Sequence, residues 1–221
     1  MSTAGLRVAV LASGSGTNLQ ALLDAAAAPG ARFALVLVVS NRPEAGALSR
    51  ATQFGVPTAT LAREGDDAPR LLALLAEARA DLIVLAGYLK LVPAAVVAAY
   101  RDRMLNIHPA LLPAFGGPGM YGRRVHEAVL ASGARVSGPT VHLVDEAFDR
   151  GRILAQWPVP VAPDDTPETL AARVLEAEHR LLPAVVGAWA ALGAAAALSF
   201  TAPALGPAPA LPVDLADALT S

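Results

Sequence analysis

An asparagine and a histidine stand one residue apart at the end of a short apolar run, within the segment from Met104 to Pro113. If residues 104–108 form a strand, Asn106 and His108 point to the same side, because residues i and i+2 of a strand share a face. A fixed amide can stabilise an oxyanion, and an imidazole titrates near neutral pH and can move protons. The pair therefore suits an acyl-type transfer, although an isolated N-x-H is more often a strand end whose polar groups satisfy backbone atoms.

A glycine-rich turn follows the first apolar segment of the chain and precedes a helical pattern. It consists of Gly14, Ser15, Gly16, Thr17 and Asn18. A strand, a glycine-rich turn and a helix together aim backbone N–H groups and a helix N-terminus at an anion. The turn lacks the third glycine of a dinucleotide fingerprint and the lysine of a P-loop. A site for a phosphate monoester and a plain tight turn are both consistent with it.

Other titratable side chains compete with His108 or support it. The remaining histidines are His126, His142 and His179. His142 falls inside a predicted strand, where a hydrogen-bonded structural histidine is the favoured interpretation over a catalytic one. Asp145 and Asp149, in one acidic loop, could orient a histidine or raise its pKa, and a solvated turn is the alternative. No spacing of His, Asp and Glu predicts a metal site, and no G-x-S-x-G element predicts a serine hydrolase.

Alternating strands and helices must position these groups. The amino-terminal half reads as a β-α repeat, which predicts an α/β protein with a parallel sheet and right-handed crossovers. Ligands of such sheets lie at the carboxyl ends of the strands. The glycine-rich turn, the loop Tyr88–Val92 and the Asn106/His108 pair all fall on that edge. We predict strands at 7–11, 33–39, 58–61, 81–87 and 104–108, and helices at 18–27, 45–54, 69–79 and 93–100.

The second half of the chain changes character. Phe115–Gly119 is a glycine-rich loop that we predict to lie over the site. The expected elements are a helix at 123–130, strands at 136–144 and 153–161, a helix at 167–192 and a short strand at 198–201. The two longer strands should pair as an antiparallel hairpin, and Thr166 should cap the last helix. Residues 202–221 are rich in Pro and Ala, which predicts a poorly ordered tail.

Composition narrows the class of protein. The chain has 221 residues, 54% of them hydrophobic and 16% charged, so a sizeable core can form. A net charge of −2 supplies no basic field that would attract nucleic acid. The absence of cysteine excludes disulfides and thiolate metal sites. Because the amino terminus lacks the basic segment of a signal peptide and no apolar run reaches spanning length, we expect a cytoplasmic protein with no membrane partner.

Five segments, taken in order, carry a resemblance to a known family. They are ASGSGTNLQ at 12–20, LAGY at 85–88, NIHPALLP at 106–113, GPTVH at 138–142 and DRG at 149–151. Together they resemble phosphoribosylglycinamide formyltransferase, the folate-dependent family of purine synthesis, over roughly residues 6–190. The resemblance implies a Rossmann-like formyltransferase fold in a single domain over 1–201. Its amino-terminal half, 6–105, would be parallel, and the half 106–201 would extend the same sheet in mixed, antiparallel fashion.

The resemblance also implies a reaction. The formyl group of 10-formyltetrahydrofolate, a co-substrate, would pass to the amine of glycinamide ribonucleotide without a metal. By position, Asn106 would hold the oxyanion, His108 would shuttle protons and Asp149 would raise the pKa of His108. The turn 14–18 would bind the substrate phosphate, and Glu178 would contact the ribonucleotide. The folate side would be formed by Arg63, Leu89, Lys90, Leu91, Val92, Asn106, Val144 and Asp145.

Alternatives within and outside the family follow from the same residues. A methionyl-tRNA formyltransferase would need a further domain and a basic surface, and a formyltetrahydrofolate hydrolase would carry an amino-terminal regulatory domain; we expect neither. A non-catalytic phosphate-binding domain predicts that Asn106, His108 and Asp149 do not converge.

The chain departs from the family pattern at two places: Ala110 stands where many relatives carry serine, and the loop 116–121 is longer than in some relatives. The expected partners are small molecules, and both a monomer and a homodimer are compatible with the sequence.

Overall fold

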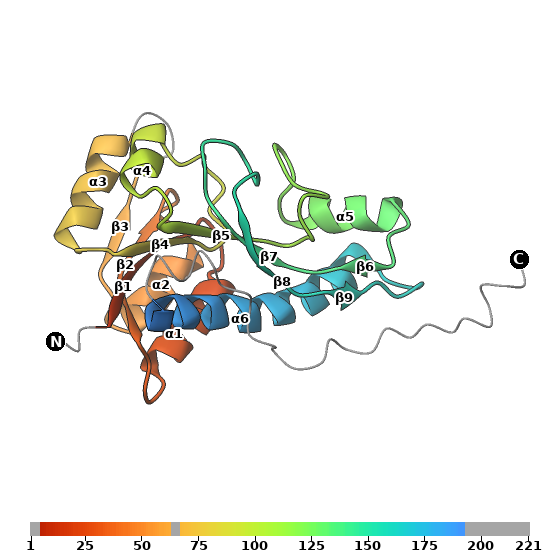
Figure 1. Cartoon of the computed structure of the whole chain (residues 1–221), viewed down its shortest axis with the longest axis horizontal. Helices are drawn as coiled ribbons and strands as arrows, with labels where there is room; N and C mark the ends of the chain where they lie inside the picture. The colour runs from red at the N-terminus through yellow and green to blue at the C-terminus, as the bar shows by residue number, and fades with distance from the viewer. Residues whose placement is uncertain (1–4, 63–66, 193–221) are drawn as a thin grey trace, which may run out of the picture.

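A seven-stranded sheet with helices on both faces organises the chain (Figure 1). The computed structural model describes residues 5–62 and 67–192. Arg63, the predicted strand 198–201 and the predicted tail 202–221 lie outside the described residues. Among the residues described, no helix is long and apolar enough to cross a membrane.

The elements follow the predicted order. The strands are β1 Leu6–Leu11, β2 Phe33–Ser40, β3 Thr58–Thr60, β4 Leu82–Leu85, β5 Met104–His108, β6 Val136–Ser137, β7 Thr140–Leu143, β8 Ile153–Gln156 and β9 Val159–Pro160. The helices are α1 Thr17–Ala27, α2 Gly46–Gln53, α3 Ala68–Glu77, α4 Ala94–Ala99, α5 Arg123–Ala131 and α6 Pro167–Leu192.

The strand order β3-β2-β1-β4-β5-β7-β8 places a parallel half beside an antiparallel extension. The first five strands pair in parallel, and β7 then pairs antiparallel with both β5 and β8. Strand β4, all four residues of which are buried, is the middle strand. The predicted fold class, with its mixed extension of the same sheet, is therefore confirmed.

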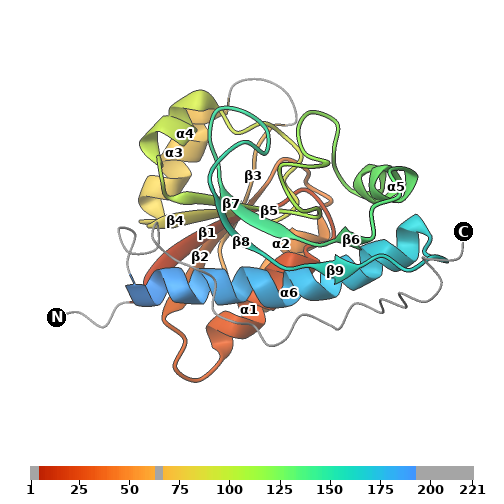
Figure 2. The same cartoon turned by 45° about the vertical axis from the view of Figure 1, so that its right-hand side comes forward.

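The two faces of the sheet are covered by different helices. Val8 and Val10 of β1 belong to a core that includes side chains of α1, α2 and α6. Ala9 and Leu11 belong to a second core, with side chains of α3 and α4. This alternation is the consequence of the two-residue period of a strand. Figures 1 and 2 show α6 running beside α1 along the length of the molecule, from β1 to the β6/β9 pair.

The predicted strands 136–144 and 153–161 are wrong as continuous elements. Each is interrupted, the first at Gly138-Pro139 and the second at Trp157-Pro158. Strands β6 and β9 pair in a separate two-stranded sheet instead of the main one. Proline donates no ladder hydrogen bond, which weakens a strand interior. At Gly138, with φ of 139°, any side chain would collide with the carbonyl oxygen of Trp157, so the two chains cross there at close range.

The long carboxyl-terminal helix agrees with the prediction. Thr166 Oγ1 accepts a hydrogen bond from Thr169 N at 3.3 Å and so caps α6. Helix α6 continues through Pro183 to Leu192. The Leu112-Pro113 peptide bond is cis.

Candidate active site

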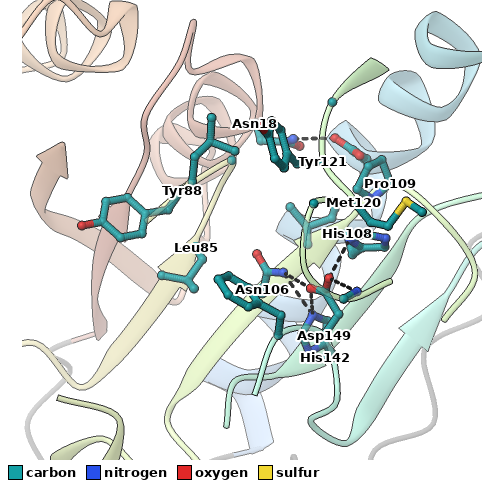
Figure 3. A pocket seen from close by; sticks show the side chains of 18 of the residues that line it. Asn18, Leu85, Tyr88, Asn106, His108, Pro109, Met120, Tyr121, His142 and Asp149 are labelled. Carbon is teal, nitrogen blue, oxygen red and sulfur yellow. Dashed lines mark hydrogen bonds and ion pairs between the residues drawn. The ribbon is translucent and has the colours of Figure 1, made fainter. Parts of the chain in front are cut away.

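The carboxyl ends of β1, β4 and β5 surround a cavity of about 660 Å³. The turn after β1, the loop after β4 and the end of β5 contribute to its wall, as the edge rule for parallel sheets predicts. The loop 144–149, helix α5 and helix α6 close the remaining sides. Figure 3 shows Asn106, His108, His142 and Asp149 gathered on one side of this cavity, with Asn18 and Tyr88 away from them.

Asn106, His108 and Asp149 converge in this cavity. His108 Nδ1 lies 3.5 Å from Asp149 Oδ2, and Asn106 Nδ2 donates to Asp149 Oδ1 at 3.4 Å. Asn106 and His108 share one face of β5, as their spacing predicts. Asp149 reaches them with φ of 55°, a left-handed backbone conformation that is uncommon for a residue other than glycine.

His142, interpreted from the sequence as a structural histidine, lies inside the same cluster. Its Nε2 is 3.0 Å from Asn106 Nδ2 and 3.6 Å from Asp149 Oδ1. Its Nδ1 lies 2.7 Å from the carbonyl oxygen of Leu143. A carbonyl only accepts, so Nδ1 carries the proton of the neutral ring, and Nε2 accepts from the Asn106 amide. The antiparallel pairing of β5 with β7 sets Asn106 directly opposite His142, a register that the sequence alone does not specify.

Burial decides the charge of the central imidazole. Burial lowers the pKa of His108, and this effect outweighs the nearby Asp149 carboxylate and the Phe115 carbonyl, both of which raise it. Asp149 raises the pKa of His108 as expected, but the net shift is downward because burial has the larger effect. Burial alone would raise the pKa of Asp149, but its hydrogen bonds, among them the one from the Gly117 N–H, and the nearby His108 hold it below its ordinary value. The pair is therefore a neutral imidazole beside a carboxylate at neutral pH.

The loop Phe115–Gly119 closes against this cluster from above β5, which confirms that it lies over the site. The Phe115 carbonyl oxygen is 2.9 Å from His108 Nε2, so that nitrogen carries the proton of the neutral ring. Gly117 N donates to Asp149 Oδ2 at 2.9 Å. Gly117 and Gly119 line the cavity. The loop thus fixes the tautomer of His108 and leaves its Nδ1 lone pair facing Asp149.

The glycine-rich turn after β1 lies at the other end of the cavity. Ser15, Thr17 and Asn18 are part of the wall, whereas Gly14 and Gly16 shape the turn. Gly16 has φ of 76°, and an added Cβ would lie 2.6 Å from Ala47 Cα, so only glycine fits. Helix α1 begins at Thr17 with no side chain capping it. Its first N–H groups and positive dipole end therefore suit an anion.

Glu178 of α6 joins the turn from across the molecule. Asn18 Nδ2 donates to Glu178 Oε2 at 2.6 Å, and Asn18 Oδ1 has no partner among the described residues. Glu178 lines the cavity yet is only 7% exposed. Burial raises its pKa to about 7, against the lowering effect of the Asn18 hydrogen bond. A carboxyl group that can donate or accept a hydrogen bond near neutral pH therefore stands beside the turn.

The opposite wall is apolar and open. The residues that line the cavity here are Leu89, Lys90, Leu91, Val92, Val144 and Asp145. Leu89, Leu91 and Phe148 are each more than two fifths exposed at this wall. Apolar side chains left exposed around a cavity fit a flat, partly aromatic ligand.

Two polar residues of this wall use their side chains within the protein. Lys90 Nζ forms an ion pair with Asp67 Oδ2 at 3.2 Å. Asp145 accepts a hydrogen bond from Ala147 N at 2.9 Å within its own exposed loop. Of the two acids considered for orienting a histidine, Asp149 is therefore the one that faces the imidazoles.

Of the two remaining histidines, one lines the cavity and the other does not. His126 of α5 lines the cavity, is 4% exposed, and its Nδ1 has no partner among the described residues. Burial lowers its pKa, and the nearby His108 lowers it further. His179 lines a different hollow, beside Arg50. The sequence did not predict that His126 lines the cavity, because this depends on how helix α5 packs over the cavity.

The family model and the relatives that match this chain agree with one another. A family model described as formyl transferase matches residues 6–186. Over 188 residues the chain is 46% identical to a chloroplastic phosphoribosylglycinamide formyltransferase of Arabidopsis thaliana, covering 82% of this chain and 64% of that relative. It is 37% identical to the phosphoribosylglycinamide formyltransferase of Haemophilus influenzae, covering 81% of this chain and 85% of the relative.

A solved structure agrees with these relatives. The crystal structure of phosphoribosylglycinamide formyltransferase from Brucella melitensis superposes with a TM-score of 0.78 at 44% identity, covering 85% of this chain and 96% of that one. The chain thus spans less than two thirds of the chloroplastic relative and most of the two bacterial ones.

Proposed function

Because this chain belongs to the formyl transferase family, we propose that it transfers the formyl group of 10-formyltetrahydrofolate to the amine of 5-phosphoribosylglycinamide. The products are formylglycinamide ribonucleotide and tetrahydrofolate, a step of purine biosynthesis. The segment 6–105 supplies the phosphate turn, and the segment 106–201 supplies the catalytic cluster, as two halves of one domain.

The observation that carries the proposal is the placement of Asn106, His108 and Asp149 between two unlike walls of one cavity. The turn 14–18 and Glu178 suit a phosphorylated amine, and the apolar wall at 89–92 suits a folate. A reaction that joins these two substrates needs its acid–base groups between them.

The residues suggest how the protons move. Amine attack forms a carbon–nitrogen bond and leaves an oxyanion on the formyl carbon. One N–H of the Asn106 amide keeps its hydrogen bond to His142, at 3.0 Å. The other N–H, which contacts Asp149 at 3.4 Å, turns from Asp149 to the oxyanion. His108 takes a proton from the attacking nitrogen, and Asp149, 3.5 Å from its ring, stabilises the resulting cation. The same proton passes to N10 of the folate as the carbon–N10 bond breaks.

Hydrolysis of the folate is the nearest alternative, because the same three residues could direct a water molecule. The turn 14–18, and Glu178 beside it, favour a phosphorylated acceptor. A non-catalytic phosphate-binding role predicts that the three residues lie apart, and their shared cavity argues against it.

One assay tests the proposal. Purified protein is incubated with 10-formyltetrahydrofolate, with and without glycinamide ribonucleotide, and both the formylated nucleotide and free formate are measured. The proposal expects formylated nucleotide as the main product. Formate release at the same rate with and without the nucleotide would contradict it and favour the hydrolase.

Several predictions from the sequence extend this proposal. We expect small-molecule substrates only, with no nucleic acid or membrane partner. Location in the cytoplasm and a state of monomer or homodimer stay predictions, which fractionation and light scattering would check.

A further inference from the structure

A buried serine connects the phosphate turn to the loop after β4. Ser13 is 2% exposed, and its Oγ donates to Asn41 Oδ1 at 2.6 Å. The same Oγ accepts a hydrogen bond from Leu89 N at 2.9 Å, and Ser13 N donates to the Gly87 carbonyl oxygen at 3.0 Å. Ser13 thus binds the segment 87–89 through two hydrogen bonds, one from its backbone and one from its side chain.

The two ends of this connection reach opposite walls of the cavity. Ser15, two residues after Ser13, belongs to the phosphate turn and lies in the wall. Leu89 and Leu91 form part of the apolar wall. Ser13 is not itself part of the wall, so it acts on a ligand only through the segments that it holds. Gly87 has φ of 73°, and the segment 86–93 contains neither helix nor strand. Its course therefore depends on local contacts such as these.

We propose that Ser13 is a positioning residue that holds the folate wall in place from the base of the phosphate turn. This inference rests on the proposed function, because it names the folate as the ligand that the wall receives. A hydroxyl that both donates and accepts is required, since Asn41 Oδ1 offers an acceptor and Leu89 N offers a donor. Alanine at this position leaves both groups without their partner.

The effect of losing the hydroxyl should fall on one substrate. The phosphate turn keeps two other ties, because Ala47 N donates to the Gly14 carbonyl oxygen at 3.2 Å and Arg50 Nε donates to the Ser15 carbonyl oxygen at 2.9 Å. Of its two hydrogen bonds to Ser13, the segment 87–89 loses the one to the side chain and keeps the backbone bond to Gly87. The upper end of the net contribution of one hydrogen bond corresponds to about a tenfold change in an equilibrium constant. Ser13→Ala should therefore raise the dissociation constant for tetrahydrofolate about tenfold.

The matched control is Ser40→Ala. Ser40 ends β2, is fully buried, and its Oγ accepts a hydrogen bond from Arg42 N at 3.1 Å. The substitution Ser40→Ala removes a buried hydroxyl at the same edge of the sheet and leaves the hydrogen bonds of the segment 87–89 unchanged. A second test variant, Asn41→Ala, removes the acceptor of the Ser13 hydroxyl and should weaken tetrahydrofolate binding in the same direction.

The experiment measures tetrahydrofolate binding by calorimetry, together with kcat and both KM values of the formyl transfer. In Ser13→Ala we expect a tenfold weaker folate interaction, with KM for the ribonucleotide and kcat within about threefold of wild type. Tetrahydrofolate binding within twofold of wild type in Ser13→Ala would overturn the inference. So would an equal weakening of the folate and the ribonucleotide interactions in Ser13→Ala, or an equal weakening of tetrahydrofolate binding in Ser40→Ala. If Ser13→Ala does not fold, the same measurements on Asn41→Ala, compared with those on Ser40→Ala, test the inference. Wild-type protein that binds no tetrahydrofolate would refute the proposed function itself, and with it this inference.

Discussion

The buried carboxyl of Glu178 should make the stability of the fold depend on pH. Burial raises its pKa from 4.5 to about 7. The folded protein therefore binds this proton more tightly than the unfolded chain does. The stabilising contribution is fully present below pH 4.5 and is lost as the pH rises through about 7. The variant Glu178→Gln keeps the shape of the side chain and removes the titration.

The size of the effect follows from the shift. A pKa difference of about 2.5 units, from 4.5 to about 7, corresponds to about 3 kcal/mol at roughly 1.36 kcal/mol per unit. Part of this loss, about 1 kcal/mol, is already present at pH 5, because the unfolded carboxyl is then mostly ionised. We therefore expect the stability of Glu178→Gln relative to wild type to increase by roughly 2 kcal/mol between pH 5 and pH 8.

Urea denaturation followed by circular dichroism, at pH 5 and pH 8, measures this difference. Titrating groups common to both proteins cancel in the comparison, apart from those coupled to Glu178. Glu176→Gln, at an exposed position of the same helix, is the control and should show no such change. A difference between Glu178→Gln and wild type that stays constant within about 0.5 kcal/mol across this range would refute the reasoning, because it would mean that Glu178 titrates alike in both states.

Three further predictions concern the chemistry. His108→Ala and Asp149→Asn should each lower kcat by about 100- to 10,000-fold while the circular dichroism spectrum is retained, and near-wild-type turnover in both would contradict the proposed proton path. His142→Ala removes the acceptor that orients Asn106, so kcat should fall by about 10- to 100-fold with KM for the ribonucleotide unchanged; a rise in that KM with kcat intact would argue for a binding role instead. Treatment with a chelator should leave turnover unchanged, and loss of activity that added metal restores would count against the reaction as written.

Local pattern was enough to predict the elements that carry the site. The run Met104–His108 is apolar, bounded by proline, and forms β5 with the predicted ends. The alternation of strands and helices predicted the parallel half, and the edge rule then brought the turn 14–18 and Asn106 to one cavity. These inferences depend on short-range periodicity and on one general rule of sheet topology.

What the sequence did not predict depends on pairing between distant segments. His142 enters the cluster because β7 pairs with β5 in one register, and a shift by one residue would turn its side chain to the other face. Asp149 was favoured over Asp145 by resemblance alone, since the left-handed backbone that aims Asp149 at the imidazoles is not visible in the residue types. The break at Gly138-Pro139 could have been inferred, because both residues disfavour a strand interior. The lowered pKa of His108 reflects its burial, which only the packed structure reveals.

The hydrogen bond between Asn18 and Glu178 joins residues that are 160 positions apart in the chain. During synthesis, the turn 14–18 is made among the first segments, whereas its partner Glu178 is made near the middle of α6. The side of the cavity that holds Asn18 and Glu178 therefore cannot be completed until α6 has emerged and packed along α1. A nascent chain stalled before α6 would display a formed turn and an open sheet face, without a working site. Because contacts so distant in sequence slow folding, docking of α6 is expected to be a late step, and catalytic competence should appear later than most of the secondary structure.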